Sequence, residues 1–452
     1  MAAAEGGAAP NRVAPGGAAS PLPLALIGVA LVVLTAAGLA LLALRPPGNP
    51  GAGRTLDVVL IEAVGGVLYL LAAAFVLRRR PPRHALAIVL GAALAMRLLL
   101  LPIAPPLSSD LYRYVWDGRV QASGINPYRY RPADPALASL RDPKVFPHIN
   151  RARTARTIYP PAAEMFFRLA AALAPGVRGM KLLMAGCDLA TIAVLIGLLR
   201  QAGRPAAQVL VYAWAPMPVW EFAGNGHVDA LAALLVALAL WAGARAWRGL
   251  AGSLLAVVML VKFLPAAIAP AFWRRWDGRL VAAFVVTVVL LYAPYLGAGR
   301  HVLGFLPGYA AQEGLLSGRG VFLLDLLSRI VGTLPGWAGA AYAAWLATLL
   351  GGMALRIGFG PPLPAAPGAR LAVLARQGAW LGAVTLVGIS PHYPWYFGWL
   401  APLACLAPAP ALLVLIAASV GLTLDPAHHV GIAALVYLPP ALLAAFPWGR
   451  RP

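Results

Sequence analysis

The feature that most constrains this chain is a series of long apolar segments that carry almost no charge. The stretch 21–44 has no charged residue and is long enough to cross a bilayer core, which needs roughly 20 apolar residues. Similar segments recur to the end of the 452 residues, of which only 11% are charged, whereas soluble domains carry about a quarter. The sequence therefore predicts a polytopic membrane protein and not an exported domain with one anchor.

The apolar segments predict an all-α fold, a transmembrane helix bundle with roughly 12 to 14 hydrophobic segments. Full spans are expected at 22–44, 57–77, 84–102, 180–199, 227–246, 279–296, 336–356, 370–389 and 427–446. Shorter segments are expected at 161–174, 207–222, 249–262, 263–273, 321–334, 396–407 and 410–424. Because several of these are too short to cross alone, we expect half-helices or re-entrant hairpins that line a cavity. Residues 1–20, rich in Ala, Gly and Pro, are expected to be a disordered tail, and residues 21–452 one membrane domain.

The formal net charge of +21 predicts a membrane topology and not nucleic-acid binding, because the arginines sit in short clusters between apolar segments. We expect the clusters at 78–83 and 450–451 to be cytoplasmic, which places the loop 103–160 on the extracytoplasmic side. The side of the segments within 161–226 stays open. Arg200 and Arg204 favour the cytoplasm, and this works only if one short segment does not cross.

The loop 103–160 is polar, aromatic and rich in proline, unlike the short connections elsewhere. Such long loops are usually functional or disordered, and aromatic residues at near-helical spacing favour an ordered loop with short helices at the membrane surface. Asp110 stands just after an outward-running span, where its carboxylate can serve as a general base. The alternative is an N-cap, since Asp after two serines commonly opens a helix. Asp117 follows Arg113 at the spacing of an ordinary helix-surface ion pair.

A second polar cluster, at 221–229, interrupts two apolar segments. Ionisable groups at membrane depth are costly and usually face a cavity. His227 and Asp229 cannot share one helix face, so both reach a pocket only if Asn225 and Gly226 form an unwound turn. The alternative is a capping turn, in which Asn225 or Asp229 satisfies the start of the next helix.

Two further candidate sites lie later in the chain. His392, Tyr393 and Trp395 fit either an interfacial aromatic belt or a sugar site, because aromatic rings stack on pyranose faces. Lys262 is one of few lysines, and at its depth it needs a partner. That partner is either a lipid phosphate or an acid on a neighbouring helix, and Asp188 with Lys181 could supply such an ion-pair network.

Several motifs are absent from the sequence. It holds no G-x-G-x-x-G after a strand, no G-x-x-x-x-G-K-[ST], no H-E-x-x-H and no C-x-x-C, so nothing supports a nucleotide-sugar or ATP mechanism. The two cysteines, Cys187 and Cys405, lie in apolar segments and are expected to be packing residues.

The polar pieces together resemble the GT-C superfamily of polytopic glycosyltransferases, which use lipid-linked donors. The resemblance is closest to the polyprenyl-phosphate-mannose-dependent α-mannosyltransferases, glycosyltransferase family 87. It covers most of the chain from about residue 57 onward. It rests on S-S-D-L-Y-R-Y-V-W-D-G-R-V-Q-A-S-G-I-N-P-Y at 108–128, I-Y-P-P-A-A-E at 158–164, G-N-G-H-V-D at 224–229, V-K-F-L-P at 261–265 and H-Y-P-W-Y at 392–396.

The resemblance implies a hexosyltransferase, most specifically a mannosyltransferase, in a bacterial-type cytoplasmic membrane with an extracytoplasmic active site. Its partners would be the bilayer, a polyprenyl-phosphate sugar donor and a lipid or glycan acceptor, and no nucleic acid. Asp110 would be the catalytic base of an inverting displacement, with the leaving phosphate held by some of Lys262, His392 and an arginine such as Arg113. Because Ser109 and not an acid precedes Asp110, we expect no metal and no cofactor. The expected substrate-binding residues are Arg113, Tyr114, Asp117, Asn225, His227, Asp229, Lys262, His392, Tyr393 and Trp395.

Two other classes of protein fit parts of the sequence. A secondary transporter or lipid flippase would explain the broken helices and the intramembrane Lys262 and Asp188, but such proteins usually show two matching halves. This chain shows no duplication of the Asp110 loop or of G-N-G-H-V-D. A polysaccharide polymerase or ligase also joins polyprenyl-linked sugars, from a lipid diphosphate donor, and the residues alone separate it poorly from a mannosyltransferase.

Overall fold

The computed structural model of the chain describes residues 20–44, 52–314, 318, 320–424 and 430–445. All regular elements within these residues are helical, as the sequence predicts, and they contain no strand. In chain order the α-helices are α1 (Leu22–Leu44), α2 (Ala52–Arg78), α3 (Ala85–Leu100), α4 (Asp110–Ala122), α5 (Pro161–Leu173), α6 (Gly176–Gln201), α7 (Leu210–Ala213), α8 (Pro216–Pro218), α9 (Asp229–Ala244), α10 (Arg248–Val261), α11 (Ala269–Phe272), α12 (Gly278–Tyr292), α13 (Leu306–Gln312), α14 (Phe322–Val331), α15 (Ala338–Gly358), α16 (Pro367–Ile389), α17 (Ala401–Leu406), α18 (Pro410–Ala418) and α19 (Val430–Ala445).

Shorter irregular helices join these elements. They are η1 (Pro135–Leu140), η2 (Phe146–His148), η3 (Ala206–Val209), η4 (Val219–Gly224), η5 (Leu264–Ile268), η6 (Ala293–Leu303), η7 (Pro394–Leu400) and η8 (Ser419–Leu424). The expected tail, apart from residue 20, and the arginines at 450–451 lie outside the described residues.

Long apolar helices form the body of the molecule. Six stretches of the described chain are long and apolar enough to cross a membrane: Leu22–Leu44, Thr55–Arg78, Gly176–Gln201, Gly278–Tyr309, Ala338–Gly358 and Pro367–Ile389. Their outward side chains are also apolar, as at Val289 and Leu290 of α12, which are 61% and 64% exposed. A surface of this kind is stable against lipid tails and not in water. The chain is therefore an integral membrane protein built as an all-α polytopic bundle.

The interior of the bundle contains broken helices. Three expected full spans, at 84–102, 227–246 and 427–446, hold helices of only 16 residues, which are α3, α9 and α19. The expected short segment 207–222 is divided into η3, α7, α8 and η4, with Pro216 and Pro218 at the break. Since α7, α8 and η4 are buried, neighbouring helices shield their irregular backbone from lipid, as the half-helix prediction requires.

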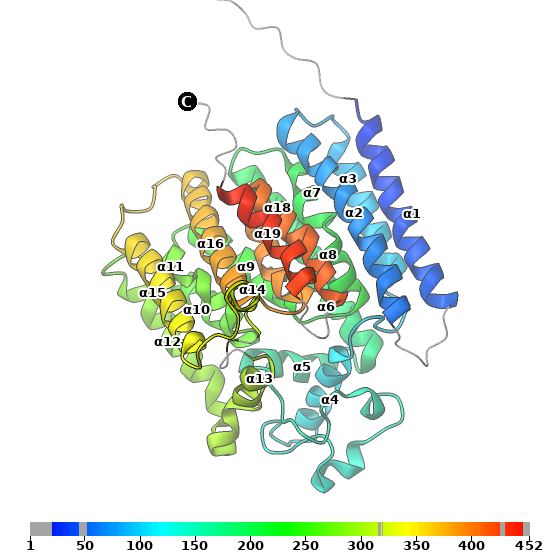
Figure 1. Cartoon of the computed structure of the whole chain (residues 1–452), viewed down its shortest axis with the longest axis vertical. Helices are drawn as coiled ribbons and strands as arrows, with labels where there is room; N and C mark the ends of the chain where they lie inside the picture. The colour runs from blue at the N-terminus through cyan, green and yellow to red at the C-terminus, as the bar shows by residue number, and fades with distance from the viewer. Residues whose placement is uncertain (1–19, 45–51, 315–317, 319, 425–429, 446–452) are drawn as a thin grey trace, which may run out of the picture.

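Helix α5 is the short segment that decides how the chain runs between 161 and 226. This helix packs against α4 at the lower end of the bundle and does not cross it (Figure 1). Lys181, near the start of α6, donates to the carbonyl oxygens of Leu100 and Ile103 at 2.7 and 2.6 Å. Therefore α6 begins where α3 finishes, and Arg200 lies at the opposite end. Arg204 lies there too, because its partner Gln208 donates to Val76 near the end of α2.

The buried ion pair of this region differs from the expected one. Asp188 of α6 pairs with Arg97 of α3 and accepts from Tyr212 at 2.8 Å. Lys181 instead satisfies carbonyl groups at the end of α3, which have no partner within that helix. The expected network of Lys181 with Asp188 is therefore wrong, because each side chain finds its partner on α3.

Candidate functional site

A cavity of about 370 Å³ lies at the end of the bundle where α3, α10 and α16 finish. Its lining comes from the segments that follow these three helices, from 150–160 and from α13. Part of the wall is apolar, made by Val261, Phe263, Leu264, Leu306 and Ile389. The volume and the mixed lining are typical of a small-ligand site.

The expected site residues divide into two layers around this cavity. Those that line it are Asp110, Arg113, Lys262, His392, Tyr393 and Trp395. Those that lie behind the lining are Tyr114, Asp117, Asn225, His227 and Asp229, all buried. Each residue of the buried layer contacts a residue of the lining, so the second layer orients the first.

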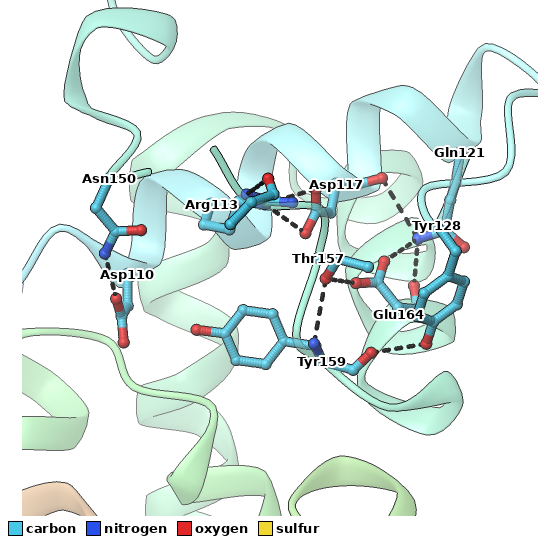
Figure 2. A network of polar contacts seen from close by, with 10 residues as sticks. Asp110, Arg113, Asp117, Gln121, Tyr128, Asn150, Thr157, Tyr159 and Glu164 are labelled. Atoms are coloured by element: carbon cyan, nitrogen blue, oxygen red, sulfur yellow. Dashed lines mark hydrogen bonds and ion pairs between the residues drawn. The ribbon is translucent and has the colours of Figure 1, made fainter. Parts of the chain in front are cut away.

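Asp110 is the first residue of α4, and its side chain faces the cavity. Its Oδ1 atom accepts a hydrogen bond of 2.9 Å from Nδ2 of Asn150, as Figure 2 shows. The N-cap position belongs to Ser109, and the Asp110 carboxylate forms no capping bond among the described contacts. This geometry favours the chemical role of Asp110 over the capping alternative.

His227 lies directly behind Asp110. The backbone reaches this position through the π-helical turn η4 and through Gly226, whose φ of +74° suits glycine. A Cβ atom at Gly226 would lie 2.9 Å from a methyl carbon of Leu111, so the turn also packs tightly on α4. The Nδ1 atom of His227 is 3.9 Å from Oδ2 of Asp110, and its ring stacks on Trp395 with centroids 4.1 Å apart. The unwound turn that His227 and Asp229 would need at Asn225 and Gly226 is present, although neither side chain lines the cavity.

Asn225 and Tyr114 complete the buried layer behind Asp110. Asn225 accepts a bond of 3.0 Å from the backbone N–H of Leu107, which holds the segment leading into α4. The Tyr114 hydroxyl is 3.4 Å from Nδ1 of His227, and the Tyr114 ring packs edge-on against Tyr159. Both residues thus hold the backbone and rings around Asp110 and do not reach the cavity.

Each cation that the sequence offers for a phosphate already has an acidic partner in the protein. Lys262 Nζ lies 2.9 Å from Oδ2 of the buried Asp229. His392 Nδ1 lies 2.9 Å from Oε2 of Glu313, and its Nε2 donates to the Gly320 carbonyl oxygen at 2.9 Å. These acids offset the positive charge that the cations present to the cavity.

Arg113 is held in the same way. Its Nε lies 2.9 Å from both carboxylate oxygens of Asp117, one turn further along α4. Asp117 thus orients the guanidinium that lines the cavity, which matches the i,i+4 ion pair expected from the spacing.

Two arginines of the cavity lining were not among the site residues predicted from the sequence. Arg151 and Arg156 line the cavity, and neither makes an ion pair with an acid among the described residues. The Arg151 guanidinium lies 5.8 Å from the centre of the Tyr309 ring, and its backbone has a φ of +52°. Such strained backbone clusters at functional sites. The basic run 151–156 in a loop expected outside the membrane is the signal that could have found them.

Aromatic rings form a further part of the cavity wall. Tyr393 stacks on Trp395 with centroids 4.6 Å apart, and Trp395 stacks in turn on His227. The hydroxyl groups of Tyr396 and Tyr309 are 2.7 Å apart, and Lys262 Nζ lies 4.5 Å from the centre of the Tyr396 ring. This wall can stack on a pyranose ring, while its hydroxyl groups offer hydrogen bonds to sugar oxygens.

A buried polar network holds the loop of the two arginines against α4 and α5 (Figure 2). Thr157 donates to Glu164 at 2.5 Å, and Gln121 donates to the other carboxylate oxygen of Glu164 at 2.8 Å. Burial raises the pKa of Glu164 well above its ordinary value, and the nearby Asp117 carboxylate raises it further. Burial also raises the pKa of Asp117, although Arg113 opposes the shift. Both shifts have the direction expected of two buried acids that lie close to each other.

Comparison with known protein families decides what kind of protein this site belongs to. The family model described as alpha-(1→6)-mannopyranosyltransferase, N-terminal domain, matches residues 17–276, more than half of the chain. The chain belongs to this family. The matched region contains Asp110, Arg151, His227 and Lys262, while the wall at 392–396 lies beyond it. The membership agrees with the resemblance to mannosyltransferases and supports a membrane-embedded sugar transferase. The chain matches no curated protein and no solved structure.

Proposed function

We propose that this mannosyltransferase moves a mannosyl residue from a polyprenyl-phosphate donor to a lipid or glycan acceptor at the extracytoplasmic face of a bacterial-type cytoplasmic membrane. The observation that carries the proposal is the cavity itself. It sets the Asp110 carboxylate, cationic side chains, stacking aromatic rings and an apolar wall around one space. A base, a phosphate site, a sugar platform and a lipid contact are the four features that such a reaction needs.

The reaction we propose is an inverting displacement. Asp110 takes the proton of the acceptor hydroxyl, and the oxygen attacks the anomeric carbon from the face opposite the phosphate. The phosphate leaves with the bonding electrons, and Arg151 and Arg156 stabilise its charge because neither pairs with an acid among the described residues. Tyr393 and Trp395 pack on the sugar ring.

We also propose that the reaction needs no divalent cation, because side chains supply the positive charge. Asp110 accepts a hydrogen bond from the side-chain amide of Asn150 and faces the imidazole of His227. Neither of these two neighbours is a second carboxylate that could share a metal ion with Asp110. No group of three or more His, Cys, Asp or Glu side chains within the described residues is arranged to hold a metal ion.

The direct experiment is a transfer assay with the purified protein. Radiolabelled polyprenyl-phosphate mannose, glucose and arabinose are each offered with a membrane lipid extract as acceptor. Transfer of mannose in preference to the other two sugars supports the proposal. Transfer from a lipid diphosphate oligosaccharide and not from the monophosphate would instead favour a polymerase or ligase.

The side of the membrane needs its own test. Helix α3 begins shortly after Arg78, the last residue of α2, and ends at the cavity, so the two lie at opposite ends of α3. Positively charged ends face the cytoplasm. In a variant without Cys187, cysteines placed at the exposed positions Ala138 and Lys144 should react with an impermeant thiol reagent in whole cells. A cysteine at the exposed Arg79 should not react, and the reverse pattern contradicts the proposed side.

The family membership weighs against the transporter and flippase alternative, because it indicates a sugar-transferring enzyme. The broken helices that suggested transport have a different use in this fold. Their interruptions place Lys262 and Tyr393 in the cavity wall and Asn225 behind it.

A further inference from the structure

Glu221 is a buried acid that the proposed reaction has not used. It lies in η4, is 1% exposed, and its Oε2 accepts a bond of 2.9 Å from Nδ2 of Asn225. The same Oε2 atom is 3.3 Å from Nε2 of His227. His227 is therefore flanked by two acids, with Glu221 at Nε2 and Asp110 at Nδ1.

Three contacts hold the backbone and side chains of this arrangement in place. The backbone N–H of His227 donates to the Glu221 carbonyl oxygen at 2.9 Å, so the turn itself fixes the two residues together. Trp395 covers one face of the imidazole, and Asn225 fixes the Glu221 side chain. The contact between Nε2 and Glu221 is close but is not aligned as a hydrogen bond in this structure. A small rotation of either side chain would align it.

We propose that Glu221 is a positioning residue that acts through His227 on the catalytic base Asp110. When Asp110 has taken the acceptor proton, His227 receives that proton at Nδ1, and the Glu221 carboxylate stabilises the resulting imidazolium. The inference rests on the proposed role of Asp110 and adds a relay of Asp110, His227 and Glu221 behind it.

The relay would give the proton on Asp110 a place to go when water cannot reach this residue. The Asp110 side chain is only 21% exposed in the empty cavity, and bound donor and acceptor would shut it off further from water. A base in that position keeps its proton unless a buried acceptor lies within reach. The distance of 3.9 Å from Asp110 to His227 is longer than a hydrogen bond, but contacts of this kind often tighten when substrates bind.

The proton balance of the step is complete. The acceptor O–H bond breaks as its proton joins Asp110, the new glycosidic C–O bond forms, and the anomeric C–O bond to the phosphate breaks with its electron pair leaving on the phosphate. The proton then moves from the Asp110 oxygen to Nδ1 of His227, which restores the carboxylate. After the product leaves, the proton returns through Asp110 to the phosphate or to water.

The charges around the imidazole fit this role. The titratable groups that face it are Asp110, Tyr114 and Glu221. The positive charge of Lys262 also acts on His227, and Asp229 offsets it at 2.9 Å. Two acidic side chains therefore face the imidazole, and removal of either one should make the imidazolium less stable.

The test compares Glu221→Gln with Glu62→Gln. Gln keeps the size of Glu221 and can still accept from Asn225, but it cannot stabilise a cation. Glu62 of α2 is a matched control, because it is also a buried acid near Glu221 and has no hydrogen-bond partner among the described residues. We expect Glu221→Gln to lower kcat about 10- to 100-fold with little change in KM for the lipid donor. Glu62→Gln should behave as the wild type.

A double variant separates a relay from a merely structural role. If Glu221 acts through Asp110, then adding Glu221→Gln to Asp110→Asn should cost almost nothing further in kcat, because the base is already gone. A structural role predicts that the two losses multiply. If Glu221→Gln does not fold in detergent, His227→Gln leaves Glu221 bound to Asn225 and carries the same two expectations.

Wild-type kcat in Glu221→Gln, an equal loss in Glu62→Gln, or multiplying losses in the double variant would each overturn the relay. The outcome is distinct from a failure of the proposed function. If Asp110→Asn is active, the proposal that Asp110 is the base is wrong. If Asp110→Asn is inactive but Glu221→Gln is active, only the relay is wrong.

Discussion

The ammonium group of Lys262 lies 2.9 Å from the carboxylate of Asp229, and Asp229 is completely buried. The two residues come from different segments, one just after α10 and the other at the start of α9. Lys262 also reaches the cavity, so it can serve both the fold and the substrate. Because of this ion pair, we expect Lys262 to matter more for the stability of the fold than for substrate binding.

Replacing Lys262 with Met should therefore affect stability before it affects donor binding. The change leaves the Asp229 carboxylate buried without a partner, which typically costs about 3–5 kcal/mol. Thermal unfolding in detergent should show a large loss for Lys262→Met and none for Lys144→Met at an exposed position. The double variant Lys262→Met, Asp229→Asn should regain most of the loss. A stable single variant whose only defect is a raised donor KM would contradict this reading.

Arg151 should be a principal contact for the donor phosphate. Hydrogen bonds to charged groups contribute about 1.5–3 kcal/mol, so Arg151→Gln should raise KM for the lipid donor about 10- to 150-fold. Arg153→Gln is the matched control, because Arg153 lies in the same turn but is exposed and does not line the cavity. Equal kinetics for the two variants would remove Arg151 from the phosphate site.

Metal removal tests the proposal that side chains alone neutralise the phosphate. Transfer of mannose should continue at close to the untreated rate in the presence of EDTA. The control adds magnesium or manganese back after chelation. Complete loss of transfer with EDTA, followed by recovery with either ion, would mean that a metal ligand is among the residues assigned other roles.

The buried pair of Glu164 and Asp117 predicts how stability depends on pH. Burial raises the pKa of Glu164 in the folded protein, so the folded state holds a proton that the unfolded state releases above about pH 4.3. Stability should therefore fall as pH rises from that value through the folded pKa. Glu164→Gln removes this dependence, because Gln does not ionise. Melting temperatures measured across pH 5 to 8 should decline less in the variant, and parallel curves for the two proteins would contradict the assignment.

The sequence predicted the all-α bundle for clear physical reasons, whereas the chemical role of Asp110 stays a prediction. Uncharged segments long enough to span a bilayer have few alternatives to a membrane helix, and Asp110 is marked by its place at the junction of a span and an amphipathic helix. The family resemblance then favoured a chemical role for Asp110 over a cap. The unwound turn at Asn225 and Gly226 was also accessible from the polar interruption between two apolar segments.

The partners of the cavity cations were not predictable in this way. Lys262 pairs with Asp229, and His392 with Glu313, across distances in sequence that no spacing rule connects. Arg151 was missed because its proposed role depends on its having no acidic partner among the described residues, and that depends on how the loop folds against α13. Periodicity predicts helices, but the pairing of charges from separate helices is a property of the tertiary structure.

The measurement that tests the central claim most directly is the turnover of Asp110→Asn. Asn keeps the size of the side chain and can still bond to Asn150, but it cannot take a proton. Because general-base catalysis contributes about 10²- to 10⁴-fold, transfer of mannose should fall by at least about a hundredfold at equal protein level. Donor binding should persist, since Asp110 contacts the acceptor and not the phosphate. Asp134→Asn, which changes an acid that caps η1 in the same loop, should leave the rate unchanged. An Asp110→Asn protein that transfers mannose at close to the wild-type rate would contradict the account.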